Sequence, residues 1–174
     1  EDKYGYIWLG TVNGLNRYDG YGMKVYEHRF GDTTSLMPSA VRFMFCDSHG
    51  RLWISFMNGL MEYDYERDAF RNCNLGDATW VTQIVEGKPG TLYIATANGL
   101  AKLNTETDQV TWFDSLNTVG RGEASQVWGI ARHRDTLYLA TRNGLAAFDL
   151  KSERHRPIKL PPNVELVVRI AVTA

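Results

Sequence analysis

The run Ile7-Trp8-Leu9-Gly10-Thr11, followed after one residue by Asn13-Gly14-Leu15, decides the fold because it recurs along the chain. The tripeptide Asn-Gly-Leu begins at residues 13, 58, 98 and 143, so its copies are 45, 40 and 45 residues apart (58 − 13, 98 − 58 and 143 − 98). Repeats of about this length are typical of propeller blades.

Each copy of the tripeptide lies between two runs that favour β-strands. The run before it has the order aliphatic, aromatic, aliphatic, small, as in Leu52-Trp53-Ile54-Ser55, Leu92-Tyr93-Ile94-Ala95 and Leu137-Tyr138-Leu139-Ala140. The run after it alternates apolar and mixed positions, which is typical of a strand. Because Asn and Gly tolerate positive φ, we predict that they form the two central residues of a type I′ hairpin turn.

Two further strands complete each unit. Turns of the form Asp-x-x-Gly, at Asp2 and Asp47 and in looser form near residues 87 and 133, join a preceding strand to the aromatic one. We predict first strands at 41–46, 81–85, 127–131 and 167–172, and fourth strands at 23–30, 69–75, 109–116 and 154–160. A sandwich or a barrel also has many short strands, but neither predicts one tripeptide at the same place in every unit.

The predicted fold is therefore an all-β propeller with about four blades of four antiparallel strands. Residues 1–174 form a single propeller segment, with repeats at about 2–40, 41–80, 81–126 and 127–166 and the start of a further strand at 167–174. Three arrangements stay open: a closed four-bladed ring, part of a larger propeller, or two chains that close one ring as a homodimer.

Charge and composition limit the partners. Nineteen Lys and Arg against twenty Asp and Glu give a formal net charge of -1 at pH 7, so no excess of positive charge attracts nucleic acid. No apolar run is long enough to span a bilayer, and we expect no membrane contact by this segment.

No constellation of catalytic residues emerges from the sequence. The four histidines, at 28, 49, 133 and 155, have no companion at metal-ligand spacing, and no nucleophile elbow or phosphate-binding loop is present. We expect no catalytic residue, no metal and no cofactor.

Ligand contacts are expected at the end of the blades that carries the Asn-Gly hairpins, because loops on a rigid scaffold often bind ligands. A sugar needs an aromatic platform together with charged or amide groups. Trp80, Arg121, Glu123 and Arg142 supply both kinds of group on this side. In the alternative interpretation, Trp80 packs between blades and the three charged side chains are solvated.

The full pattern, Asp-x-x-Gly-x-Ile/Leu-Trp-Ile/Leu-x-Thr-x-Asn-Gly-Leu-x-x-Tyr/Phe-Asp, resembles the two-component regulator propeller repeat. Residues 2–19 and 47–64 carry it most fully, and the two later copies have Tyr in place of Trp. The resemblance implies a periplasmic sensor region of a hybrid two-component system (histidine kinase and response regulator) that detects a carbohydrate or another nutrient-derived ligand.

Three functions remain open on this evidence. The first is a noncatalytic ligand-sensing module, with the propeller continued in a longer parent chain. The second is a propeller lyase or glycan-cleaving enzyme, which would gather histidines and acids at one place. The third is a platform for protein docking or dimerisation.

Overall fold

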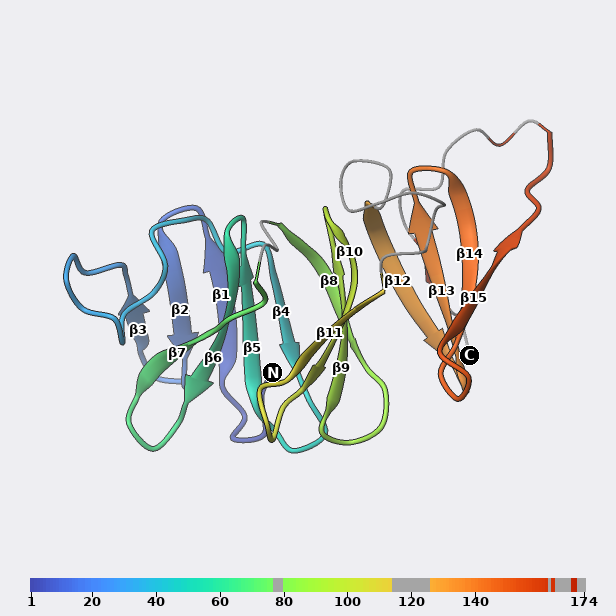
Figure 1. Cartoon of the computed structure of the whole chain (residues 1–174). Coiled ribbons are helices and arrows are strands. Elements are labelled where there is room, and N and C mark those ends of the chain that lie inside the picture. The colour runs from blue at the N-terminus through green and yellow to red at the C-terminus, as the bar shows by residue number, and fades with distance from the viewer. Residues whose placement is uncertain (77–79, 114–125, 163, 165–169, 172–174) are drawn as a thin grey trace. The chain divides into compact units, whose positions relative to one another are not determined.

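A computed structural model describes residues 1–76, 80–113, 126–162, 164 and 170–171. The chain divides into two compact units, Glu1–Gly76 and Asp77–Ala174, whose positions relative to one another are not determined (Figure 1). We describe each unit by itself. None of the described segments forms a helix that could span a bilayer.

Unit 1 consists of two antiparallel sheets. The first sheet has three strands in the order β1-β2-β3, and the second has four in the order β4-β5-β6-β7. The strands are β1 (Ile7–Thr11), β2 (Gly14–Tyr18), β3 (Met23–Tyr26), β4 (Phe43–Cys46), β5 (Leu52–Phe56), β6 (Gly59–Asp64) and β7 (Ala69–Cys73).

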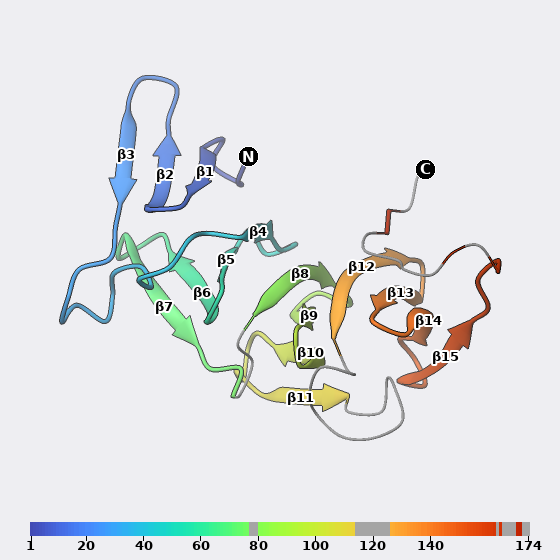
Figure 2. The same cartoon turned by 90° about the horizontal axis from the view of Figure 1, so that it is seen from above.

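Unit 2 consists of two four-stranded antiparallel sheets, in which each strand pairs with the next along the chain (Figure 2). One sheet has β8 (Val81–Glu86), β9 (Thr91–Thr96), β10 (Gly99–Asn104) and β11 (Val110–Phe113). The other has β12 (Val127–His133), β13 (Thr136–Thr141), β14 (Gly144–Asp149) and β15 (Arg154–Ile158).

The predicted all-β architecture with blade-like sheets is confirmed. The fourth strands are shorter than predicted: the first ends at Tyr26 rather than at residue 30, and β7 ends at Cys73. The strand expected at 167–172 falls mostly on residues outside the described part of the chain. The division into one propeller segment, and its closure, stay predictions.

Each unit has its own hydrophobic core, which is formed by the aliphatic and aromatic residues that recur at the same positions of each repeat. The aromatic and aliphatic residues of β5 and β9 are almost completely buried, as two-sided burial of the second strand predicts. In unit 1 the core joins both sheets through Trp8, Leu15, Tyr26, Leu36, Leu52, Ile54, Phe56, Met61, Tyr63 and Phe70.

The Asn-Gly hairpins form as predicted, but the predicted type I′ turn is wrong. β1 and β2 pair Thr11 with Gly14, so the loop consists of Val12 and Asn13, and none of the four asparagines has a positive φ. Thr11 explains this geometry, because its Oγ1 accepts the Asn13 N–H at 3.2 Å and donates to the Gly14 carbonyl at 3.0 Å. Thr96 and Thr141 close their hairpins in the same way.

Glycine is required at the strand end of this hairpin. Gly14 has a φ of 151°, and a Cβ there would lie 2.3 Å from the Tyr26 carbonyl oxygen. A residue with a side chain at this position would have to push β3 away from β2.

The turns between third and fourth strands are closed by one carboxylate or amide oxygen. In each case Oδ1 accepts the N–H groups two and three residues further on, as Asp and Asn do in Asx turns. The four residues are Asp19, Asp64, Asn104 and Asp149.

The Asp-x-x-Gly turn ties the backbone to the buried tryptophan of the next strand. Asp47 Oδ1 accepts the N–H groups of His49 and Arg51, and Oδ2 accepts Trp53 Nε1–H at 3.1 Å and Arg51 Nε–H at 2.8 Å. Although burial opposes the charge, the hydrogen bonds from Arg51 and Trp53 hold the pKa of Asp47 below its ordinary value.

Candidate functional site

The sequence places its four expected ligand residues at the Asn-Gly end of unit 2, and the structure describes two of them. Trp80 directly precedes β8 and is 44% exposed. Arg142 is exposed in the hairpin between β13 and β14. Arg121 and Glu123 lie outside the described residues. A shared ligand site made by these four residues therefore stays a prediction.

Comparing the two units reveals a different site. The hairpin tripeptides of unit 2 follow those of unit 1 by 85 residues in both sheets (98 − 13 and 143 − 58). Strand register extends the correspondence to the outer strand, since Leu15 pairs with Tyr26 and its counterpart Leu100 pairs with Phe113. The space between the two sheets of unit 1 can thus be compared, residue by residue, with the space between the two sheets of unit 2.

Aromatic rings fill the space between the two sheets of unit 1. The Trp8 ring lies 5.7 Å from that of Tyr26 and 4.8 Å from that of Tyr63. The two phenol oxygens are 3.1 Å apart, and both hydroxyls donate to Asp68. Arg17 donates to the Tyr63 oxygen at 2.9 Å.

Asp68 is the acceptor at the centre of this network. Burial works against its charge, but hydrogen bonds from Lys24, Tyr26 and Tyr63 lower the pKa of Asp68 to about 2. Burial and the bond to Asp68 raise the pKa of Tyr63 to about 12. The described polar groups of this network therefore bond to one another and leave little capacity for a ligand.

Asp2 occupies the end of the same space. Its Oδ2 accepts Trp8 Nε1–H and the Tyr65 hydroxyl, both at 2.7 Å. Its Oδ1 accepts the N–H groups of Tyr4 and Tyr6 at 2.9 and 3.0 Å. Every hydrogen-bonding direction of this buried carboxylate is used by its own unit.

Unit 2 also has aromatic rings between its two sheets, but its described residues lack the hydrogen-bond network that Asp2 and Asp68 form in unit 1. Tyr93, Phe113 and Phe148 form the corresponding ring cluster, with centroids 4.8 to 6.5 Å apart. The two phenylalanines lack the hydroxyls that hold Asp68 in unit 1. The ion pair between the sheets is retained, because Lys102 and Glu153, the counterparts of Arg17 and Asp68, are 2.5 Å apart.

Smaller residues open a groove of about 380 Å³ at this place in unit 2. Gly87 stands where unit 1 has Asp2, Thr91 where it has Tyr6, Thr111 where it has Lys24, and Leu150 where it has Tyr65. The groove is lined by Gly87, Lys88, Thr91, Tyr93, Lys102, Asn104, Gln109, Thr111, Arg132, Asp135, Leu150, Lys151 and Glu153. Its volume lies within the range of small-molecule sites.

Tyr93 forms part of the groove wall and is 4% exposed. Its counterpart Trp8 donates to Asp2, but Gly87 offers no carboxylate, and the Tyr93 hydroxyl bonds to no residue in the described part of the chain. Burial and the nearby Glu153 charge raise the pKa of Tyr93 to about 12. The hydroxyl is therefore a neutral group at physiological pH.

Arg132 brings a positive charge to the same end of the groove. It stands where unit 1 has Cys46, since these residues pair with Leu137 and Leu52 at corresponding places in the register. Its Nη1 donates to the Gly87 and Glu86 carbonyls at 2.6 and 2.9 Å. The backbone thus fixes the guanidinium beside the position that Asp2 fills in unit 1.

The groove carries an excess of positive charge. Lys102 pairs with Glu153, and Lys151 pairs with Asp135 at 2.6 Å. Lys88 and Arg132 have no carboxylate partner among the described residues. The four cations and two anions of the lining therefore leave two uncompensated positive charges in a chain whose overall charge is -1.

Sequence reasoning missed this groove because it expected function at the opposite end of the blades. Residues 87, 135 and 150–153 belong to the turns that connect first to second and third to fourth strands, away from the Asn-Gly hairpins. The signal was present in the sequence as the loss of Asp at position 87 together with the change from Trp8 to Tyr93.

A second groove, of about 630 Å³, lies in unit 1 and includes Tyr4 and Tyr65. Its arginines are engaged: Arg51 with Asp47, Arg67 with Asp64 and Arg71 with Glu62. This balance of charges makes it a weaker candidate than the groove in unit 2. The fourth cation of its lining is Lys3, whose Nζ lies 5.1 and 5.3 Å from the Tyr4 and Tyr65 ring centroids.

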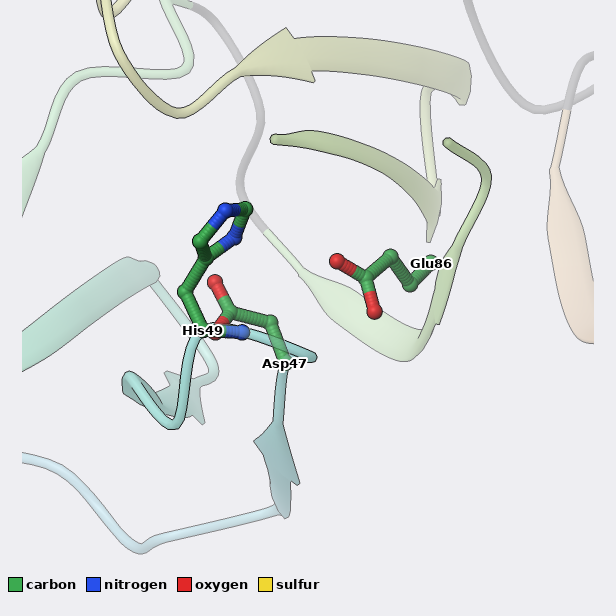
Figure 3. Close-up of side chains that lie close together, drawn as sticks. All are labelled: Asp47, His49 and Glu86. Carbon is green, nitrogen blue, oxygen red and sulfur yellow. The ribbon is translucent and has the colours of Figure 1, made fainter. Parts of the chain in front are cut away.

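Figure 3 labels Asp47 and His49 of the β4–β5 turn in unit 1 and Glu86 of unit 2. Because the positions of the units relative to one another are not determined, we describe no site that involves both. Within unit 1, both oxygens of Asp47 already accept two hydrogen bonds each, so this carboxylate acts as a structural anchor.

Comparison with known protein families found no family model that matches the chain. Over 36 residues, the chain is 44% identical to a protein named Histidine kinase P4 from Formosa agariphila, a match that covers 21% of the chain and 3% of that protein. The chain thus spans a small part of this relative.

Solved structures share the fold over almost the whole chain. The extracellular domain of a hybrid two component system from B. thetaiotaomicron matches with a TM-score of 0.77 and 22% identity, over 94% of this chain and 24% of that one. A virginiamycin B lyase from Staphylococcus aureus, solved with quinupristin, matches with a TM-score of 0.71 and 18% identity, over 94% of this chain and 55% of that one. The propeller fold is confirmed, and at these identities the likeness extends to the fold alone.

Proposed function

We propose that the chain is a ligand-sensing propeller module of a two-component signalling protein, positioned outside the cytoplasmic membrane. The observation that carries the proposal is the match of 94% of the chain to the extracellular domain of a hybrid two component system. The short stretch that is 44% identical to a histidine kinase supports the same context.

The groove of unit 2 is the proposed ligand site, and a carbohydrate is the proposed ligand. Thr91, Thr111, Asn104 and Gln109 offer hydroxyl and amide groups to sugar hydroxyls. Tyr93 and Leu150 offer apolar surface to the C–H faces of a sugar ring. A groove that combines a few polar groups with an aromatic wall is typical of small-molecule sites.

Binding without turnover is the form of activity that we propose. The described lining of the groove contains no histidine, and each of its two acids, Asp135 and Glu153, pairs with a lysine, so the lining offers no pair of unengaged groups for acid–base chemistry. The second candidate is a lyase, because the fold also matches virginiamycin B lyase.

Thermal unfolding with a panel of neutral and acidic oligosaccharides tests the proposal. A sensor module should show a rise in Tm with one class of sugar, because a ligand that binds the native state stabilises it, and chromatography should show the sugar unchanged. Cleaved products would favour the lyase. A mass that grows with protein concentration, without any response to sugars, would favour a docking platform.

A further inference from the structure

We infer that the groove of unit 2 binds a sugar that carries a carboxylate, a uronic acid residue of an acidic glycan, with the carboxylate at the end of the groove where Gly87 replaces Asp2 and Arg132 lies. This inference rests on the proposed function, since it names the ligand class of the same groove.

The first step is the loss of an acidic residue, which the comparison of the two units reveals. In unit 1, the Asp2 carboxylate receives the indole N–H of Trp8 and the hydroxyl of Tyr65. Unit 2 has Gly87 at the position of Asp2, and a Cβ at Gly87 would lie 2.7 Å from Cε2 of Tyr93. The Tyr93 ring therefore lies against the glycine, and no side chain of the turn supplies an acid there.

The second step concerns the hydroxyl of Tyr93, a hydrogen-bond donor in the groove wall. Tyr93 is 4% exposed and lines the groove, and its hydroxyl bonds to no residue in the described part of the chain. Because Ser55 Oγ is the one described side-chain oxygen or nitrogen that is buried without a hydrogen bond, the Tyr93 hydroxyl is open to the groove and can donate to a ligand there. A ligand oxygen in the groove would supply the missing partner.

The third step is charge. Arg132 is held by the Gly87 and Glu86 carbonyls through Nη1 and by the Arg134 carbonyl through Nε, while Nη2 bonds to no described residue. Lys88 retains the lysine that unit 1 has as Lys3. A fixed guanidinium with a free N–H and a second cation in the lining of the same groove favour a carboxylate over a neutral group.

The remainder of the groove selects a sugar rather than a simple organic acid. Thr91, Thr111 and Gln109 line the wall beyond the charged end. Their hydroxyl and amide groups match the ring hydroxyls of a uronate, and about 380 Å³ accommodates one or two sugar residues.

Calorimetric titration of the full chain with digalacturonate, at low ionic strength, tests the inference, with the neutral disaccharide of galactose as the matched probe. We expect the acidic sugar to bind and the neutral one to bind at least tenfold more weakly. The acidic sugar should lose affinity as salt is added, because the contact is between opposite charges.

Two variants locate the binding site. Tyr93→Phe removes only the hydroxyl and should raise the Kd for digalacturonate by about tenfold, since hydrogen bonds to charged groups are among the stronger ones. Lys88→Gln should raise it by roughly two- to fivefold. The control is Lys3→Gln, because Lys3 occupies in unit 1 the repeat position that Lys88 occupies in unit 2. This variant should leave the Kd unchanged.

The outcomes separate this inference from the proposed function. Binding of the neutral disaccharide as tightly as the acidic one would overturn the carboxylate site and leave the sensor proposal standing. Equal binding of succinate and digalacturonate would keep the anion site and overturn the sugar. Absence of any response to the acidic sugar, with Tyr93→Phe and the parent chain both folded by circular dichroism, would overturn the inference outright.

Discussion

Replacing Asp47 by asparagine removes a negative charge from the Asp-x-x-Gly turn of unit 1 while keeping the size of the side chain. The asparagine oxygen can still accept the N–H groups of His49 and Arg51, which Asp47 Oδ1 accepts at 3.0 and 2.9 Å. The amide nitrogen would then stand where Oδ2 accepts Arg51 Nε–H and Trp53 Nε1–H. Three donors would meet without an acceptor.

The expected cost follows from these two lost contacts. Asp47 is 6% exposed, so water cannot replace the acceptor. One charge-assisted bond contributes about 1.5–3 kcal/mol, and an unsatisfied buried donor costs about 1–3 kcal/mol. We therefore expect Asp47→Asn to lower the free energy of unfolding by about 3 kcal/mol at pH 7.

Urea unfolding followed by tryptophan fluorescence measures this change. Asp19→Asn is the matched control, because Asp19 is an exposed turn residue whose Oδ1 accepts only backbone N–H groups and because Asn104 already fills that repeat position. The control should change the free energy of unfolding by less than about 0.5 kcal/mol.

The pH dependence provides a second readout. The folded pKa of Asp47 is lower than the unfolded one, so its carboxylate contributes stability above about pH 4 and loses it as the pH falls through the folded pKa. The difference between the parent chain and Asp47→Asn should therefore be constant between pH 5 and 7 and shrink below pH 4. If Asp47→Asn and Asp19→Asn have equal effects at pH 7, the anchoring account of the turn is wrong.

Three further substitutions test other parts of the structure. Tyr63→Phe removes a hydroxyl that donates to Asp68 and should lower the free energy of unfolding by about 2 kcal/mol, measured by urea unfolding; an unchanged midpoint would contradict the network. Gly87→Asp puts a carboxylate at the charged end of the groove and a Cβ 2.7 Å from Cε2 of Tyr93, so the ring must shift; with the fold retained by circular dichroism it should abolish binding of digalacturonate in calorimetry, whereas undiminished binding would place the sugar elsewhere. Gly14→Ala should lower the free energy of unfolding by at least about 2 kcal/mol, because the new Cβ meets a carbonyl oxygen of the neighbouring strand; a stability equal to that of the parent chain would show that the hairpin adapts.

The repeat made the sheets predictable from the sequence, because strand alternation and the hairpin tripeptide agree in every copy. The turn type was not predictable from Asn and Gly alone. The Thr11 hydroxyl bonds to both ends of the loop and selects a different geometry from the one that Asn13 and Gly14 favour locally. Side-chain bonds of this kind compete with backbone preferences and are hard to infer from composition.

The groove could not be predicted from the sequence for a different reason. Gly87, Thr91 and Thr111 are unremarkable residues when each is considered singly, and only superposition on Asp2, Tyr6 and Lys24 shows that a volume has been emptied. A hollow between two sheets depends on side chains that are far apart along the chain. Residues 121 and 123, on which the sequence-based site partly rests, fall outside the described residues.

The exposed apolar residues of the edge strand β1 bear on how the protein behaves at high concentration. Its sheet has three described strands, and β1 lies at the edge, with Ile7 40% and Leu9 45% exposed, whereas the same positions of β5 are buried. An apolar edge of this kind is a template on which another extended chain can add by main-chain pairing. We expect that a charged residue at Leu9 would reduce any association through β1, which sedimentation velocity over a range of concentrations would measure.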